Sequence, residues 1–216
     1  MREYHKIEGL YVREEGTKRL IPGVYRNHMV EFLKDVQWLF TEKIDGTNIR
    51  VVWDGHRVSF YGRTDKATIP PMLMEALDDR FGGESNEQMF EQLFGDKHVV
   101  LYGEGYGAKI QNGDGYLPER NDFILFDVEI NDRFLNRENV VDISKNLGIP
   151  VVHCVCRGTI QDGVDFVKNR PMSRIGNAKM EGVVGRPRFE LFDQNGNRVI
   201  VKIKVRDFDE IDRYKE

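Results

Sequence analysis

The chain has few cysteines and no long apolar run. Its two cysteines, Cys154 and Cys156, are too few and too close together for a disulfide framework. They would share one face of a strand, so we expect free, buried or half-buried thiols rather than metal ligands. No apolar stretch approaches the roughly 20 residues of a membrane-spanning helix, and the first residues have no apolar signal core. We therefore expect a cytoplasmic protein with no membrane segment.

The sequence also lacks an excess of basic residues. Lys and Arg number 32 against 36 Asp and Glu, which gives a formal net charge of −4. A protein that coats nucleic acid non-specifically is basic, so any contact with nucleic acid must come from a local patch. Repeats and low-complexity tracts are absent as well. With 40% hydrophobic and 11% aromatic residues, the chain can bury a core, and we expect one domain over residues 1–216.

The pattern of apolar and turn residues predicts antiparallel sheets. Asp54-Gly55, flanked by alternating apolar positions, is the strongest hairpin signal. Strands do not alternate regularly with helices, which disfavours a parallel doubly wound sheet. We therefore expect the α+β class, with antiparallel β-sheets and flanking helices. The expected helices are Val30–Lys34, Met72–Phe81, Asn86–Phe94 after a Ser85 cap, Arg137–Leu147 after Asn136, and Ile160–Lys168 after Thr159.

The run Phe40–Asn48 is the centre of the sequence. Alternating apolar residues lead into it and out of it, which predicts a strand, a tight turn at Gly46 and a second strand. Lys43 then lies at a strand end, where a site can hold it rigidly. Burial and neighbouring cations favour the uncharged amine, which can act as a nucleophile. The alternative is a surface hairpin with an ordinary Lys43–Asp45 pair.

Other polar or aromatic residues stand at predicted strand ends in the same way. They supply cations for phosphates, acids for a metal ion or ribose, and a ring that can stack on a base, an inventory that suits nucleotidyl transfer. Glu104 lies between glycines, but the G-x-G-x-G spacing there matches a dinucleotide fingerprint poorly. Strand alternation places Phe126 and Asp127 on opposite faces. The residues of this set are Lys43, Arg63, Glu104, Phe126, Glu181, Lys202 and Lys204.

Each of these residues also has a plainer interpretation. Phe126 can be ordinary core, and Lys202 with Lys204 can form a solvated strand face. Asp127 and Glu129 can be the exterior of a sheet. For Arg63 the alternative is an ion pair with Asp65 or Asp45.

The order of these residues resembles that of the covalent nucleotidyltransferases, the polynucleotide ligases and mRNA-capping enzymes. The resemblance covers residues 42–204 and implies an ATP-grasp-like nucleotidyltransferase domain. The motif Glu42–Asn48, with Gly-Thr-Asn at its end, is most similar to RNA ligases of the phage double-strand type and the RNA-editing type. Those ligases often have His where Asp45 stands, so the role of Asp45 does not follow from the resemblance.

The resemblance implies an ATP-dependent RNA ligase that joins 3′-OH and 5′-phosphate RNA ends. Lys43 would form a lysyl-AMP intermediate, with Mg²⁺ or Mn²⁺ as the metal, and AMP would then pass to the RNA end. The partners would be RNA ends at a nicked duplex or a broken RNA. Carried over position by position, the resemblance assigns catalysis to Lys43, Lys202, Lys204 and Arg63. Nucleotide binding would involve the same four residues together with Glu42, Ile44, Asn48, Glu104 and Phe126. The metal would be bound by Glu181, Glu104 and Asp45.

Ligases of this kind usually carry a C-terminal OB-fold or helical domain, and only twelve residues follow Lys204. We expect a small standalone ligase without such a domain, in which RNA binding is weak and salt-sensitive or an accessory protein supplies it. Two alternatives remain within the superfamily, a DNA ligase and a GTP-dependent capping-type guanylyltransferase. A third, from another class, is a non-catalytic nucleotide- or RNA-binding module.

Overall fold

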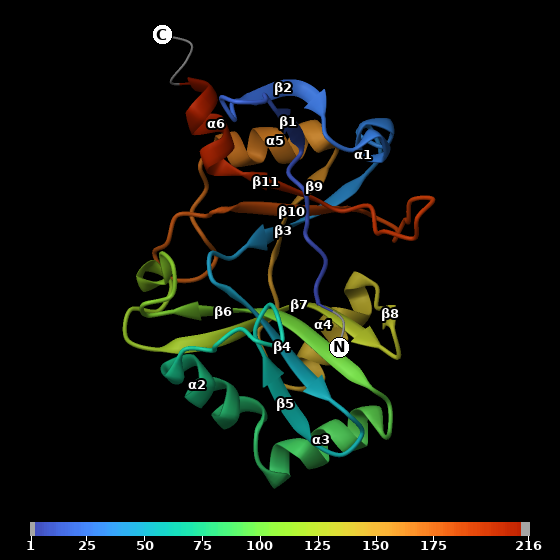
Figure 1. The fold of residues 1–216 in the computed structure, drawn as a ribbon, viewed down its shortest axis with the longest axis vertical. Helices are drawn as coiled ribbons and strands as arrows, with labels where there is room; N and C mark the ends of the chain where they lie inside the picture. The colour runs from blue at the N-terminus through green and yellow to red at the C-terminus, as the bar shows by residue number, and fades with distance from the viewer. Residues whose placement is uncertain (1–2, 213–216) are drawn as a thin grey trace. The chain divides into compact units, whose positions relative to one another are not determined.

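The computed structural model describes residues 3–212 of the chain, and the side chains of residues 3–209. The chain forms two compact units, which are described separately. The five-stranded unit consists of Met1–Tyr4 and Asp45–Val152, and the four-stranded unit consists of His5–Ile44 and His153–Glu216. The strands of every sheet pair antiparallel, and helices accompany the sheet of each unit (Figure 1). The predicted α+β class is confirmed.

The five-stranded unit is built on a sheet of order β5-β4-β6-β7-β8. Its elements are β4 (Thr47–Trp53), β5 (Val58–Tyr61), α2 (Pro71–Phe81), α3 (Glu84–Phe94), β6 (Val99–Gly107), the 3₁₀ turn η1 (Gly113–Gly115), β7 (Asn121–Ile130), β8 (Arg133–Phe134) and α4 (Arg137–Asn146).

One face of this sheet packs against the helices. In β4, Ile49, Val51 and Trp53 join the core formed with α2, α3 and α4, while the alternate residues Asn48 and Arg50 lie on the other face. The Asp54-Gly55 hairpin forms as predicted and joins β4 to β5. The face opposite the helices therefore carries the polar side chains of β4.

The four-stranded unit contains a sheet of order β11-β10-β3-β9 and a separate two-stranded sheet. Its elements are β1 (Tyr11–Arg13), β2 (Leu20–Tyr25), α1 (His28–Phe32), β3 (Trp38–Lys43), β9 (Cys154–Gly158), α5 (Ile160–Lys168), β10 (Gly182–Pro187), β11 (Val201–Lys204) and α6 (Val205–Asp212).

Helix α5 covers one face of the four-stranded sheet (Figure 1). Its Val164 packs into a core with Trp38 and Phe40 of β3, Val183 of β10 and Ile203 of β11. Because residues two apart in a strand share a face, the intervening residues of β3 and β11 point to the opposite face. Both lysines of β11 are among those residues.

The strands on either side of Lys43 do not form the predicted hairpin. β3 pairs with β10 and β9, whereas β4 pairs with β5 and β6. The apolar alternation located both strands correctly, but it carries no information about which strands become neighbours.

The helix caps are mostly as predicted. Asn136 caps α4, and Thr159 caps α5 in a capping box with Asp162. Helix α3 is the exception, because it begins at Glu84 after Gly83, so that Ser85 lies inside its first turn.

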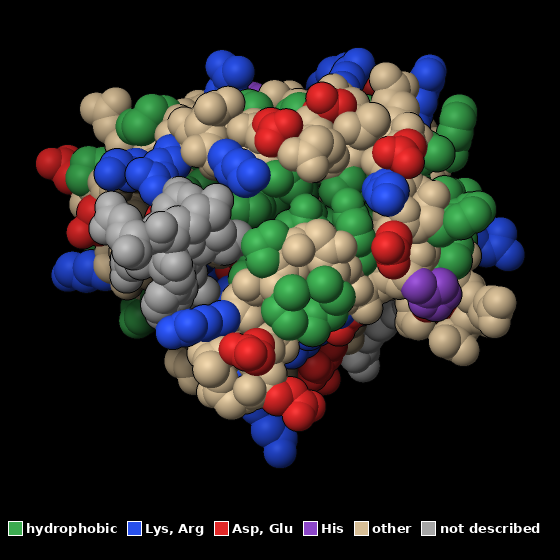
Figure 2. Space-filling view, turned by 90° about the horizontal axis from the view of Figure 1, so that it is seen from above, with side chains coloured by type: hydrophobic (Ala, Val, Ile, Leu, Met, Phe, Trp, Pro, Cys, Tyr) green, Lys and Arg blue, Asp and Glu red, His purple; other side chains and the backbone are tan. Residues whose placement is uncertain are grey.

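The two thiols are free, with Cys156 half-buried and Cys154 exposed, so the expected burial of Cys154 was wrong. No helix within residues 3–212 has both the length and the apolar character needed to cross a membrane. Acidic and basic side chains are interspersed on the face drawn in Figure 2, around a central group of hydrophobic side chains. That face carries no large surface of one sign.

Candidate active site

Lys43 is the last residue of β3 in the four-stranded unit. The buried residues Trp38 and Phe40 fix the strand on one face, so Lys43 points to the other, where a quarter of its side chain is exposed. A lysine at the end of an anchored strand has a fixed direction and keeps access to solvent. This is the position that the sequence predicted for it.

The carboxylate of Glu181 joins Lys43 to Lys204. The Nζ atom of Lys43 donates to Oε2 of Glu181 at 2.6 Å, and Nζ of Lys204 donates to Oε1. The register explains the meeting, because Gly182 of β10 pairs with Lys43 on one side and Lys204 on the other. One carboxylate thus lies between two ammonium groups contributed by different strands.

Gly182 permits this close approach of the three strands. Its φ is +156°, and a Cβ atom there would clash with the carbonyl oxygen of Ile203 and come within 2.8 Å of Cα of Lys204. A side chain at this position would push β10 away from β11. The glycine after Glu181 is therefore a requirement of the cluster geometry.

The electrostatics of the cluster follow from this geometry. Burial works against ionisation of Glu181, but the charge of Lys43 and hydrogen bonds from Lys204 and Lys43 together lower the pKa of Glu181 below its ordinary value. For Lys202, burial and the charges of Lys204 and Lys43 lower the pKa. Lys202 is thus a half-buried cation in a crowded positive environment.

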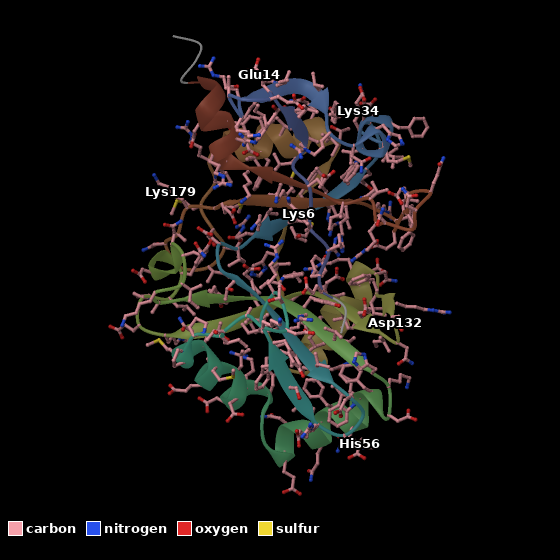
Figure 3. The ribbon with its side chains drawn as sticks, in the orientation of Figure 1. Lys6, Glu14, Lys34, His56, Asp132 and Lys179 are labelled. Atoms are coloured by element: carbon pink, nitrogen blue, oxygen red, sulfur yellow. The ribbon has the colours of Figure 1, made fainter. Side chains whose placement is uncertain are left out.

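The N-terminal segment adds a cation that no motif predicted. The amide N–H of Lys202 donates to the carbonyl of Glu8 at 2.9 Å, and that of Leu10 donates to the carbonyl of Lys202 at 3.2 Å. This pairing brings Lys6, labelled in Figure 3, close enough that its charge helps to lower the pKa of Lys202. Lys6 lies almost 200 residues before its neighbour, so sequence spacing gave no signal for it.

Glu42 lies on the opposite face of β3 from Lys43. Its side chain is buried, with 2% of the residue exposed, and Oε2 accepts from the amide N–H of Arg174 at 3.0 Å. The other oxygen, Oε1, is buried and has no hydrogen-bond partner within the described residues. A buried carboxylate oxygen without a donor is an open acceptor.

Phe126 in the five-stranded unit lies at an irregularity of β7. Tyr102 pairs with Asp127 and Gly103 with Leu125, so Phe126 is an extra residue between them, as in a β-bulge. The Tyr4 ring lies edge-on to Phe126, with centroids 5.0 Å apart, and its hydroxyl donates to Oδ2 of Asp127 at 2.8 Å. Phe126 and Asp127 therefore lie on one face, and the prediction of opposite faces was wrong because the bulge interrupts the alternation.

Two of the plainer interpretations do not hold for this unit. Asp127 and Glu129 are buried, with 0% and 2% exposed, so they are not a sheet exterior. Phe126 is half-buried and lies outside the helix-covered core. Its ring is held by an aromatic neighbour without being enclosed by the core.

Asn48 and Glu104 are direct neighbours across β4 and β6. Gly46, just before β4, allows the close approach, because a Cβ atom there would clash with the Gly105 carbonyl and lie 2.8 Å from Cγ of Glu104. The side-chain oxygen of Asn48 is buried without a partner among the described residues. This part of the unit thus presents an acceptor beside a half-buried carboxylate.

Asp45 is tied to the glycine-rich loop after β6. Its Oδ2 accepts from Nδ2 of Asn112 at 2.7 Å, and its amide N–H donates to the Tyr116 hydroxyl at 3.2 Å. The strand that holds Lys43 has ended before this residue. The alternative of an ordinary Lys43–Asp45 pair is therefore not formed, because Asp45 is bound to Asn112 and Tyr116 and Lys43 to Glu181.

Arg63 lies two residues beyond the end of β5 and is exposed. Within the described residues its side chain makes neither an ion pair nor a hydrogen bond, so the expected alternative of a pair with Asp65 or Asp45 is not formed. Asp65 instead forms an ion pair with Arg50, a fully buried arginine of β4, with 2.7 Å between Oδ1 of Asp65 and Nη2 of Arg50. Sequence reasoning missed Arg50, because an arginine between apolar residues of a strand reads as a solvent-facing position.

A family model described as RNA ligase matches residues 36–204. The chain belongs to the RNA ligase family. The match spans well over half of the sequence and includes all the candidate residues that were predicted from the sequence.

Solved structures of the RNA ligase from Naegleria gruberi share the fold. A variant with ATP and Mn superimposes with a TM-score of 0.66 at 18% identity, covering 100% of this chain and 58% of that one. A variant with AMP and Mn gives 0.65 at 18% identity, with 94% and 56% covered, and a variant without ligand gives 0.64 at 17%, with 99% and 60% covered. This chain thus spans a little over half of the length of these structures. No curated protein matches it in sequence.

The carboxylates of this member of the RNA ligase family suit a metal ion that binds together with phosphate groups. Within the described residues there is no group of three or more His, Cys, Asp or Glu side chains that could hold a metal ion. A single carboxylate, Glu181, lies in the lysine cluster. Mg²⁺ is commonly held by one or two carboxylates together with substrate phosphates and water, so one carboxylate beside three lysines suits a metal–phosphate complex better than a resident metal.

The candidate residues fall into two sets, one in each unit. The four-stranded unit brings together Lys43, Glu181, Lys202 and Lys204, with Ile44 buried beyond Lys43 and Glu42 on the reverse face. The five-stranded unit carries Asp45, Asn48, Arg63, Glu104 and Phe126. The first set can bind and attack a phosphate, and the second offers a ring, acceptors and a free cation.

Proposed function

We propose that this member of the RNA ligase family is an ATP-dependent RNA ligase that joins a 3′-hydroxyl to a 5′-phosphate through a lysyl-AMP intermediate. The observation that carries the proposal is the Lys43–Glu181–Lys204 cluster, with half-buried Lys202 beside it. The Naegleria gruberi ligase, whose fold this chain shares, has been seen with ATP and Mn and with AMP and Mn.

In the first step, the uncharged amine of Lys43 attacks the α-phosphorus of ATP. Lys43 first gives one ammonium proton to solvent; a nitrogen–phosphorus bond then forms, the bond to the bridging oxygen breaks, the nitrogen gives a second proton to solvent and pyrophosphate leaves. Lys202 and Lys204 would hold the α-phosphate oxygens, where negative charge builds up in the transition state. These cations are set by β11 before the nucleotide binds, so little reorganisation is needed.

Glu181 would change partners during this step. In the structure its carboxylate holds both Lys43 and Lys204. Mg²⁺ or Mn²⁺, when bound, would screen the phosphate charges and provide a Lewis acid. Engagement of Glu181 with the metal would release Lys43 to act as the nucleophile and free Lys204 to hold phosphate.

The remaining roles concern the nucleotide and the RNA. Phe126, held edge-on by Tyr4, would stack on the adenine. Glu104 would bind the ribose hydroxyls, and its neighbour Asn48 would form a further hydrogen bond to the nucleotide. Ile44 and Glu42 would contact the adenine, with Oε1 of Glu42 as the open hydrogen-bond acceptor. Arg63 would bind the phosphate of the RNA end.

Two further steps complete the reaction. An oxygen of the RNA 5′-phosphate attacks the lysyl-AMP phosphorus, the nitrogen–phosphorus bond breaks and Lys43 is regenerated. The RNA 3′-hydroxyl then attacks the activated 5′-phosphorus, losing its proton, and AMP leaves as the phosphodiester forms. The same cations can serve all three steps, since each passes through a phosphorus centre with added negative charge.

Covalent labelling tests the proposal directly. We expect the protein, incubated with α-labelled ATP and Mn²⁺ or Mg²⁺, to become labelled, and Lys43→Ala to lose the label completely. Lys34→Ala is the matched control, because Lys34 is an exposed lysine just beyond α1 in the same unit (Figure 3). Equal labelling of the Lys43→Ala variant would refute the proposal.

Substrate comparisons separate the alternatives. Labelling by GTP in preference to ATP would favour a capping-type guanylyltransferase, and sealing of DNA nicks in preference to RNA nicks would favour a DNA ligase. Nucleotide binding without any covalent adduct would favour a non-catalytic binding module. Efficient ATP labelling with sealing of RNA nicks is the result that we expect.

A further inference from the structure

A fully buried arginine stands in the middle of β4, where the motif residues give it no role. The side chain of Arg50 is 0% exposed, the same as the apolar core residues around the sheet. It lies on the face opposite the helices and pairs in register with Tyr61 of β5 and Tyr102 of β6. A buried guanidinium in this position requires an explanation.

Two hydrogen bonds of Arg50 reach residues on either side of Arg63. Nε of Arg50 donates to the carbonyl oxygen of Gly62 at 2.9 Å, and Nη2 donates to Oδ1 of Asp65 at 2.7 Å. The guanidinium also lies 5.5 Å from the centre of the Tyr61 ring. Arg50 thus holds the residue immediately before Arg63 and the residue two positions after it.

The segment that Arg50 holds leads into a tight turn. The amide N–H of Ala67 donates to the carbonyl of Thr64 at 3.2 Å, and a Cβ atom on Gly62 would lie 2.8 Å from Cβ of Ala67. Arg63 projects from this turn and is exposed, whereas Asp65 is half-exposed and directed to Arg50. The two charged residues therefore differ in their surroundings, since Asp65 is paired with Arg50 and Arg63 extends into solvent.

Energetics favour a positional role over a stabilising one. A buried charge loses its hydration, and a well-packed apolar residue in its place is often as stable or more stable. What an apolar residue cannot do is donate two hydrogen bonds in fixed directions, as the planar guanidinium does. Lysine would keep the positive charge but could not donate two hydrogen bonds in the fixed planar arrangement of a guanidinium.

We propose that Arg50 is a positioning residue, which holds the segment from Gly62 to Asp65 so that Arg63 is directed at the 5′-phosphate of the RNA. This inference rests on the proposed function and adds a residue to it. Arg50 itself touches neither nucleotide nor RNA; it acts through Arg63. Steps that use the RNA 5′-phosphate depend on this arrangement more than formation of lysyl-AMP does.

The test compares Arg50→Lys, Arg63→Ala and the double variant. Each is assayed for lysyl-AMP formation and, separately, for sealing of a nicked RNA duplex. We expect Arg50→Lys to reduce sealing about 10- to 100-fold, as a misplacement near 1 Å can, and to reduce lysyl-AMP formation much less. In the Arg63→Ala background, Arg50→Lys should cause almost no further loss of sealing.

Two more variants guard against a trivial loss of folding. Asp65→Asn removes the charge of the outer partner at a half-exposed position, keeps a side-chain oxygen that can accept from Arg50, and should reproduce a weaker form of the same sealing defect. Arg80→Lys alters another ion-paired arginine of the five-stranded unit, bound to Asp122 at 2.7 Å, and should leave sealing unchanged. Thermal unfolding of each variant reports the folded fraction.

Distinct outcomes overturn the inference and the proposed function. Equal losses in lysyl-AMP formation and sealing by Arg50→Lys, or a further full loss in the Arg63→Ala background, would mean that Arg50 does not act through Arg63. Failure of the unaltered protein to form lysyl-AMP would instead refute the proposed function.

Discussion

The lysine cluster depends on the carboxylate of Glu181. It neutralises part of the charge of Lys43 and Lys204, which would otherwise repel each other across Gly182. With 15% of its side chain exposed, Glu181 is shielded from bulk water, so these interactions are screened less than those of a surface pair. The cluster is therefore an organised site already without nucleotide.

This arrangement predicts a pH-dependent contribution of Glu181 to stability. The pKa of Glu181 is lowered from 4.5 in the folded protein, so folding favours the charged form. At pH 7 we expect Glu181→Gln to lower the free energy of unfolding by about 1–3 kcal/mol, since two hydrogen bonds between charged groups are weakened. The difference should begin to shrink as the pH falls toward 4.5, and disappear once the pH is below the folded pKa.

Urea unfolding of both proteins between pH 7 and pH 3 measures this difference. Glu31→Gln, at an exposed position of α1, serves as the control and should change stability by less than about 0.5 kcal/mol at pH 7. A difference that stays constant down to pH 3 would show that the charge of Glu181 does not stabilise the fold.

At the level of elements, the approach of β3, β10 and β11 depends on Gly182. Alanine at this position would place its methyl group against the backbone of Ile203 and Lys204. We expect Gly182→Ala to destabilise the protein by about 2–4 kcal/mol and to abolish labelling by ATP, because both a strained backbone and an overpacked contact are created. Thermal unfolding and covalent labelling provide the two measurements.

Gly9 offers a control beside the same strand. It lies next to Lys202 of β11, but a Cβ atom there would have nothing within 4 Å. Gly9→Ala should therefore leave stability and labelling almost unchanged. Equal effects of the two substitutions would mean that the close approach at Gly182 is unimportant.

The sequence predicted elements with clear periodicity and failed where the chain departs from it. Alternation in β11 correctly assigned Lys202 and Lys204 to the face away from the core, and the apolar run of β3 correctly placed Lys43 at a strand end. The same rule misplaced Phe126, because a bulge adds one residue to β7 and shifts the pattern. Local pattern does not encode such an irregularity, nor which strand lies beside which.

Residues that depend on long-range contacts were the least predictable. Tyr4 reaches Asp127 across 123 positions of sequence, and Lys6 reaches Lys202 across almost 200. The burial of Arg50 follows from the turn after β5, which is specified by a different part of the chain. In each case the neighbour lies far away in the sequence, so local pattern gave no signal for the contact.

On the scale of the whole molecule, charge would limit how the proposed RNA substrate is bound. The net charge is −4, and acidic and basic side chains are mixed on the face shown in Figure 2. The cations assigned to phosphates are few, namely Lys43, Lys202, Lys204 and Arg63. Attraction to RNA should therefore come from a small number of contacts and not from the field of a basic surface.

A salt titration of RNA binding tests this limit. Each phosphate contact contributes about 0.7–0.9 to the slope of log K against log salt concentration. With about three or four contacts, we expect a slope between about −2 and −4 for a labelled nicked RNA duplex, measured by fluorescence anisotropy.

Arg63→Ala should make the slope about one less negative, because one phosphate contact is removed. Arg57→Ala, which alters an arginine with 76% of its side chain exposed, should leave the slope unchanged. A slope steeper than about −6, or one unaffected by Arg63, would show that RNA is held by a broader basic surface than these residues form.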